Sequence, residues 1–138
     1  MIDSIGGIVI FVSNQARAIE FYTQKLGFDI KGEYPYKNTK WIEVGPKNST
    51  STISLMEPHP DMMTNEEMEQ AKKEIGTMTN LWFYTKNIDN TYKELQEKEV
   101  NITEPKKQDW GGIMLQIKDQ DDNILTLISS YEDHKHIK

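Results

Sequence analysis

The sequence predicts an α+β fold made of two copies of a βαβββ module, and two observations support that prediction. First, a β-branched and aromatic run at residues 8–12 leads into an amphipathic helix, and the same order recurs from Leu81. Second, the later strands also repeat: WIEV at 41–44 matches MLQI at 114–117, and TISLM at 52–56 matches ILTLI at 124–128. Because internal repetition can determine a whole architecture, the duplication is the main evidence for the fold class.

In the first module, the helix after the first strand has a start signal, an apolar stripe and a stop signal. Ser13 or Asn14 can cap it, since either side chain accepts a backbone N–H from the first turn. Gly27 suits the left-handed conformation that ends many helices. The residues expected to face the sheet are spaced at helical intervals: Ala18, Ile19, Tyr22 and Leu26. Three strands are expected to follow, at 28–30, 41–44 and 52–56, with 34–38 as a loop or turn.

The two modules are expected at 1–57 and 79–130 of a single domain that spans 1–138. The connecting segment, 58–78, interrupts the repeat; Thr64 and Asn65 precede an acidic first turn there, which predicts a short helix. A polar tail is expected at 131–138. The second module is predicted to begin with a strand at 81–85, a helix at 88–98 and a second, short strand at 100–103. A loop at 105–112 and a final hairpin at 114–128 follow, with 119–123 as the hairpin turn.

Composition excludes several classes of function. The 138 residues suit one domain, and the net charge of -6 argues against a nucleic-acid groove, which needs a basic surface. No apolar run is long enough to span a bilayer, and no basic leader with an apolar stretch opens the chain. Without cysteine there is no disulfide, thiolate nucleophile or thiolate metal site, and a cytoplasmic location is the default expectation.

The duplicated pattern resembles the vicinal oxygen chelate superfamily, which includes glyoxalase I, the bleomycin-resistance proteins and dioxygenases. The resemblance rests on IVIFVSNQARAIEFYTQKLGF in the first module, and on NLWFYTKNIDNTYKEL and KDQDDNILTLI in the second. It implies that the two modules curl eight strands into an incomplete barrel around a cleft. It also implies a homodimer.

The resemblance further implies four positions that hold a metal ion in the enzymatic members of the superfamily. In this sequence those positions are occupied by Gly7, Ser54, Asn80 and Thr126. Glycine has no side chain and the other three are neutral oxygen donors, whereas transition metals are bound by imidazole and carboxylate groups. We therefore expect no metal and no cofactor. The three histidines do not restore a site, because His59 lies between prolines and His134 and His136 lie in the tail.

Strand alternation sorts the residues of each module onto two faces. The face expected under the helices is almost wholly aliphatic, whereas the other face mixes aromatic, methionine and polar side chains, as small-molecule pockets do. The predicted ligand-binding residues are Trp41, Glu43, Ser54, Met56, Asn80, Trp82, Tyr84, Trp110, Met114, Gln116 and Thr126. For Trp41, Trp82 and Tyr84 the alternative is packing in the core or a dimer interface. For Trp110, which could close the cleft mouth, it is a plain turn.

Glu43 is the only charge on the mixed face and is the one weak candidate for a catalytic group. Among aromatic side chains, a carboxylate could bind a cationic ligand or act as a base. The alternative is that Glu43 reaches solvent or pairs with Lys40 or Lys106.

Three hypotheses about function follow. The first is a metal-free protein that binds or sequesters an aromatic small molecule, which can also be cationic. The second is a metal-dependent enzyme of the glyoxalase or dioxygenase type with an atypical site. The third is a dimeric scaffold with no ligand. The absence of the four usual metal ligands favours the first.

Overall fold

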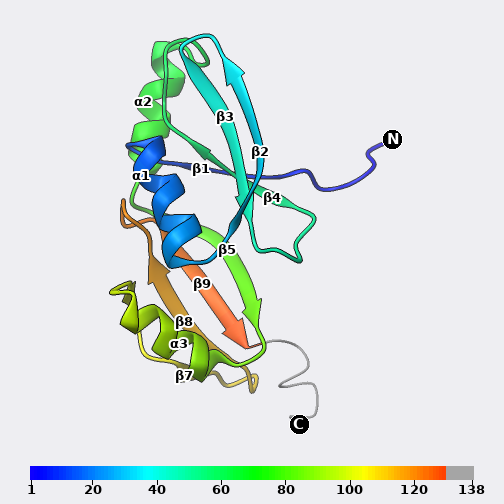
Figure 1. Cartoon of the computed structure of the whole chain (residues 1–138), viewed down its shortest axis with the longest axis vertical. Coiled ribbons are helices and arrows are strands. Elements are labelled where there is room, and N and C mark those ends of the chain that lie inside the picture. The colour runs from blue at the N-terminus through cyan, green and yellow to red at the C-terminus, as the bar shows by residue number, and fades with distance from the viewer. Residues whose placement is uncertain (130–138) are drawn as a thin grey trace. The chain divides into compact units, whose positions relative to one another are not determined.

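A computed structural model describes residues 1–129 of the chain (Figure 1). The chain forms two compact units, which divide between Gly76 and Thr77. The predicted tail at 131–138, with His134 and His136, lies outside the described residues. Each unit is built around its own β-sheet.

The first unit contains a four-stranded mixed sheet with the order β1-β4-β3-β2. Strands β1 and β4 are parallel, and the other neighbours are antiparallel. Its strands are β1 (Gly7–Phe11), β2 (Asp29–Tyr36), β3 (Thr39–Gly45) and β4 (Thr52–Met56). Its helices are α1 (Gln15–Glu20), the π-helical turn η1 (Phe21–Lys25) that continues α1, and α2 (Asn65–Glu74).

The second unit repeats this plan with the order β5-β9-β8-β6. Strands β5 and β9, the first and last of this unit along the chain, are parallel, as β1 and β4 are in the first unit. The short strand β7 also pairs with β8. Its elements are β5 (Met78–Thr85), α3 (Ile88–Glu97), β6 (Asn101–Ile102), β7 (Lys106–Lys107), β8 (Ile113–Lys118) and β9 (Ile124–Ser129). The predicted α+β class with two βαβββ-like modules is therefore confirmed.

The aliphatic face of each sheet forms the core of its unit, as strand alternation predicts. In the first unit the buried side chains are Ile10, Val12, Ile42, Val44, Ile53 and Leu55; in the second they are Leu115, Ile117, Leu125 and Leu127. Ala18 and Tyr22 add to the first core and Ile88 and Leu95 to the second, because the helices turn their apolar stripes inward. Ile8, expected on the buried face, is 38% exposed because β1 is an edge strand.

The helix after β1 begins and ends where the sequence signals predict. Asn14 is its cap, and its side-chain oxygen accepts a hydrogen bond from the Arg17 backbone N–H at 3.0 Å. Gly27 follows the last turn with φ of 73°, a conformation that glycine adopts without strain. The second half is wound as a π-helix, in which the Leu26 N–H donates to the Phe21 carbonyl at 3.3 Å.

The predicted loop at 34–38 is wrong for its first three residues. They continue β2, and only Lys37 and Asn38 form the turn, with Lys37 at φ of 51°. Pro35 suggested a loop because it lacks a backbone N–H. At the sheet edge that N–H is not needed by a neighbouring strand, so proline is tolerated.

Within residues 1–129, no helix is both long and apolar enough to cross a membrane.

Candidate functional site

The mixed face of the first unit carries a row of residues that crosses all four strands and is small or polar on three of them. Gly32 of β2 lies opposite Glu43 of β3, Glu43 lies opposite Ser54 of β4, and Ser54 lies opposite Val9 of β1. Directly opposite residues on neighbouring strands point to the same side of a sheet. The row therefore joins two predicted site residues, Glu43 and Ser54.

A second row flanks the first and is aromatic. Tyr34 lies opposite Trp41 in the β2–β3 pairing, so both rings are on the side of the sheet that carries Glu43. The Trp41 indole Nε1–H donates a hydrogen bond to Glu43 Oε2 at 3.0 Å. Tyr34 is 56% exposed, whereas Trp41 and Glu43 are half-buried. The indole thus fixes one carboxylate oxygen beside an exposed ring.

Gly32 makes this arrangement possible because it has no side chain. A Cβ atom at Gly32 would lie 2.7 Å from the Tyr34 ring and 2.8 Å from Glu43 Oε1. Both distances are too short for a real contact, so the two groups occupy the space that a side chain at this position would need. Glu43 Oε1 and the Tyr34 ring therefore lie close to the same point.

Ser54 is buried and its hydroxyl has no partner. The residue is 3% exposed, and its Oγ makes no hydrogen bond to the described part of the chain. Most buried hydroxyl groups are hydrogen-bonded, since leaving one unpaired destabilises the fold. This orphan hydroxyl directly opposite Glu43 is the least expected feature of the face.

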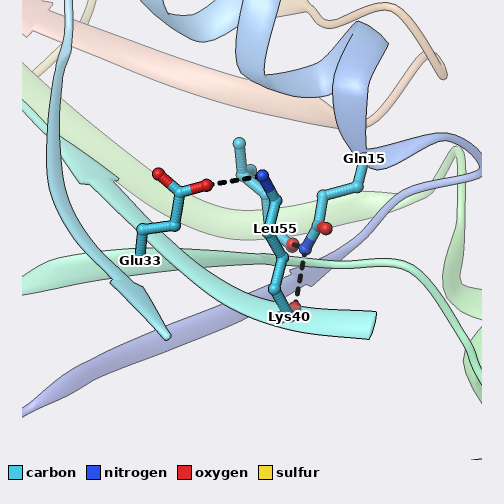
Figure 2. Close-up of polar contacts among 4 residues, drawn as sticks. All are labelled: Gln15, Glu33, Lys40 and Leu55. Carbon is cyan, nitrogen blue, oxygen red and sulfur yellow. Dashed lines mark hydrogen bonds and ion pairs between the residues drawn. The ribbon is translucent and has the colours of Figure 1, made fainter. Parts of the chain in front are cut away.

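The proposed pairing of Glu43 with Lys40 is not formed. The Lys40 ammonium instead contacts Glu33 Oε1 at 2.6 Å (Figure 2). Glu33 and Lys40 alternate with Tyr34 and Trp41 along their strands, so this ion pair belongs to the opposite side of the sheet. Lys106, the other suggested partner, is in β7 of the second unit.

Gln15 holds the neighbouring ends of β3 and β4, where these strands no longer pair with each other. Its side-chain Nε2 donates to the Lys40 carbonyl at 3.0 Å and to the Leu55 carbonyl at 2.9 Å (Figure 2). Its backbone N–H donates to Glu57 Oε1 at 2.9 Å. A pocket of about 610 Å³ lies beside these hydrogen bonds of Gln15. It is lined by Asn14, Gln15, Ala16, Ile19, Pro35, Lys37, Asn38, Thr39, Lys40, Glu57 and His59. None of the predicted site residues lines it.

The mixed face of the second unit has two rows of predicted site residues. Trp82, Thr126 and Gln116 lie opposite one another across β5, β9 and β8. Tyr84 and Met114 flank them, each opposite Ile128. Trp82 is 55% exposed and Tyr84 62%, so neither ring is used in the core of its unit.

Asn80 and Trp110 occupy irregular backbone. The pairing of β5 with β9 shifts register between Met78 and Trp82, and Asn80 lies within that shift at φ of 61°. Trp110 lies in a tight turn, in which Gln108 N–H donates to the Gly112 carbonyl at 2.8 Å. A Cβ at Gly112 would collide with the Trp110 ring, so the ring lies directly over this glycine.

The residues at the four family metal positions do not fit a transition metal. At Gly7 even a Cβ atom would meet the Thr52 carbonyl oxygen, and Ser54, Asn80 and Thr126 offer only neutral oxygens. In the described part of the chain, no three His, Cys, Asp or Glu residues are close enough to hold a metal ion. His59 is engaged locally, since its Nδ1 accepts the Asp61 backbone N–H at 3.0 Å.

Sequence reasoning missed two residues of the first unit, Gly32 and Tyr34. Tyr34 was assigned to a loop because of Pro35, although Tyr34 and Tyr36 already show the period of two that marks a strand. Ile128 of the second unit was also missed, and continuing the alternation from Ile124 and Thr126 would have placed it on the mixed face.

Comparison with known proteins agrees with this architecture. Residues 4–127 match the Glyoxalase/Bleomycin resistance protein/Dioxygenase superfamily. The chain is 30% identical to the protein YetH of Bacillus subtilis (strain 168) over 129 residues, which cover 92% of this chain and 98% of YetH. The duplicated βαβββ class is thus assigned to a family: this chain belongs to the glyoxalase/bleomycin resistance protein/dioxygenase superfamily.

Two solved structures show the same fold. UcmS2 matches with a TM-score of 0.79 and 25% identity, over 94% of this chain and 100% of UcmS2. TnmS3, described as an antibiotic binding protein from Streptomyces sp. CB03234, matches with a TM-score of 0.74 and 26% identity, over 93% of this chain and 96% of TnmS3.

Proposed function

We propose that this chain is a binding protein that sequesters an aromatic small molecule without a metal ion. The observation that carries the proposal is the pair of mixed sheet faces, each of which leaves large rings exposed: Tyr34 in the first unit, Trp82 and Tyr84 in the second. Exposed aromatic side chains with scattered polar groups are typical of ligand sites, because rings stack on planar molecules while polar groups orient them.

Two further observations support this proposal over a metal-dependent enzyme. The family metal positions carry Gly7, Ser54, Asn80 and Thr126, which lack the imidazole and carboxylate groups that a catalytic metal requires. In addition, the structurally similar TnmS3 is described as an antibiotic binding protein. A binding role needs only complementary surfaces.

The proposal is tested by a thermal-shift screen of planar aromatic compounds, including antibiotics, against the purified protein. A ligand at a hundredfold excess over its dissociation constant should stabilise the chain by about 2.7 kcal/mol. Trp82→Ala should reduce that stabilisation for a ligand that stacks on the mixed face of the second unit, because it removes an exposed ring there. Tyr92→Ala, which removes a ring from α3 outside the mixed faces, is the matched control and should retain it.

Two results would contradict the proposal. Stoichiometric transition metal in the purified protein, by elemental analysis, would favour the enzyme hypothesis. A screen without any stabilising compound would favour the scaffold hypothesis.

A further inference from the structure

The Glu43 carboxylate is a charge without a counter-charge. It is half-buried, and its hydrogen bond comes from the neutral Trp41 indole at 3.0 Å. The ion pairs formed within residues 1–129 join other residues, and Lys40, the nearest lysine in sequence, is held by Glu33. A partly buried carboxylate is stabilised by a cation, and residues 1–129 provide none at Glu43.

The free oxygen of this carboxylate lies beside an aromatic ring. The indole donates to Oε2, whereas Oε1 and the Tyr34 ring both lie over Gly32, at 2.8 and 2.7 Å from the position that a Cβ atom would take there. A ligand that places a ring on Tyr34 therefore has a negatively charged acceptor next to that ring.

Ser54 is a second and independent sign of an absent polar partner. Its hydroxyl is unpaired although the residue is only 3% exposed, and it lies directly opposite Glu43 on the neighbouring strand. Alanine would fill this position without an orphan polar group. An unpaired buried hydroxyl destabilises the free protein, and a ligand that binds beside Glu43 would give it a partner.

We propose that Glu43 and Ser54 select the ligand, and that they select a protonated nitrogen attached to an aromatic ring system. The nitrogen donates to Glu43 Oε1, the ring lies against Tyr34 and Trp41, and Ser54 supplies the further polar contact. Trp41 is a positioning residue as well, because its indole holds the carboxylate in place. This inference rests on the proposed function, which requires only that aromatic molecules bind.

The test uses two tricyclic probes of similar size and different charge: proflavine, which is cationic at neutral pH, and acridone, which is neutral. Dissociation constants are measured by fluorescence titration for the wild-type chain and for Glu43→Gln, Ser54→Ala and Glu33→Gln. Glu43→Gln removes the charge but keeps an oxygen for the Trp41 indole. Glu33→Gln is the matched control, since it removes a carboxylate of the neighbouring strand on the opposite side of the sheet.

The wild-type chain should bind proflavine at least about tenfold more tightly than acridone, the size of one charged hydrogen bond. Glu43→Gln should remove this preference by weakening proflavine binding alone, and Glu33→Gln should preserve it. Ser54→Ala should weaken proflavine binding while leaving the melting temperature of the free protein equal or higher, an outcome that a purely structural role would not produce.

Each other outcome overturns the inference. Equal affinity of the wild-type chain for both probes would refute charge selection while leaving the proposed function intact. An equal effect of Glu43→Gln and Glu33→Gln would assign the preference to overall charge, and an unchanged affinity in Ser54→Ala would remove Ser54 from the site. Binding of neither probe would overturn the inference, whereas the proposed function would still be decided by the thermal-shift screen of planar aromatic compounds.

Discussion

The two units share a strand order but differ in how their parallel strand pair is built. In the first unit, β1 and β4 pair in continuous register from Gly7–Thr52 to Phe11–Met56. In the second unit, the pairing of β5 with β9 shifts between Met78 and Trp82. The Thr79 hydroxyl bridges this irregularity, donating to the Ile124 carbonyl at 2.7 Å and accepting the Leu81 N–H at 3.2 Å. A duplicated sequence pattern therefore does not guarantee duplicated backbone geometry.

The mixed faces of the two units also differ in the burial and the strand neighbours of their hydroxyl groups. The first unit buries the unpaired Ser54 hydroxyl beside a carboxylate. Its counterpart in the second unit, Thr126, is half-buried between Trp82 and Gln116 and adjoins no charge on its strand neighbours. The face of the first unit therefore offers a charged acceptor beside its rings, whereas the strand neighbours of Thr126 in the second unit offer an exposed ring and a neutral amide.

The hydrophobic cores of the two units should lose similar stability when a buried leucine is truncated. This is the largest effect that we predict. Leu55 of β4 is fully buried and its repeat partner, Leu127 of β9, is 5% exposed. Leu55→Ala and Leu127→Ala should each lower the free energy of unfolding by about 2–5 kcal/mol, since each loses apolar burial and leaves a cavity. Urea denaturation measures both. A loss below about 1 kcal/mol in one variant would show that the two cores are not equivalent.

Substitutions in the hairpin turns that precede β4 and β9 should, by contrast, change stability by different amounts. In the second unit, the buried Asp119 carboxylate accepts the backbone N–H groups of Asp121 at 2.8 Å and Asn123 at 3.0 Å, and the Asn123 side-chain amide at 2.9 Å. Asp119→Ala should therefore destabilise the chain by about 2–3 kcal/mol, because buried donors lose their acceptor.

The matched change in the first unit is Ser49→Ala, which removes one hydrogen bond from Ser49 Oγ to the Ser51 carbonyl. Its effect should stay below about 1 kcal/mol. Thermal unfolding of the two variants side by side provides the measurement, and equal effects would contradict the assigned role of the Asp119 network.

Gly7 and Asn80 are counterparts in the repeat, but the residue type is restricted for a different reason at each position: close packing at Gly7 and a positive φ at Asn80. Gly7 lies against the Thr52 carbonyl, so Gly7→Ala should destabilise the chain by about 1–3 kcal/mol through overpacking. Asn80 has φ of 61°, which glycine adopts more readily, so Asn80→Gly should change stability by less than about 0.5 kcal/mol. Chemical denaturation distinguishes the two. Clear destabilisation by Asn80→Gly would mean that its side chain, not its backbone, matters.

Helix α2 has no counterpart among the described residues of the second unit, and the change predicted for it is the smallest. The Thr64 backbone N–H, followed by its hydroxyl, lowers the pKa of Glu67 in the capping box. Because the folded-state pKa is lowered, the stabilisation is present above the unfolded-state pKa and is lost as pH falls through the folded-state pKa. Glu67→Gln should therefore destabilise the chain slightly near pH 7 and less at about pH 3.

Unfolding measured at the two pH values checks this prediction, with Glu69→Gln of the same helix as the control. The same difference at both pH values would show that the charge of Glu67 is not responsible.

Much of the fold could be predicted from the sequence, because the spacing of apolar residues and the residues that cap helices are local signals. Asn14, Gly27 and Thr64 mark helix ends as expected, and alternation along β9 separates buried from half-buried residues. The register shift at Asn80 could not be predicted, since it depends on how β5 pairs with a strand far away in sequence.

The candidate site was predicted by residue type rather than by geometry. Alternation placed Trp41, Glu43 and Ser54 on one face, but it could not reveal that the indole bonds the carboxylate or that the hydroxyl is unpaired. Those facts depend on rotamers and on neighbours from three strands. Gly32 carried no chemical signal of its own, because its role is the space that it leaves for Tyr34 and Glu43.

Pro35 has a consequence for the behaviour of the protein in concentrated solution. It lies in β2, the outermost strand of the first sheet, whose free edge would otherwise offer an unbroken series of donors and acceptors to strands of other molecules. The proline ring withholds one donor there, and charged side chains at Lys31 and Glu33 discourage close approach. Replacing Pro35 with valine would restore this donor and should therefore make pairing between the β2 edges of different molecules easier.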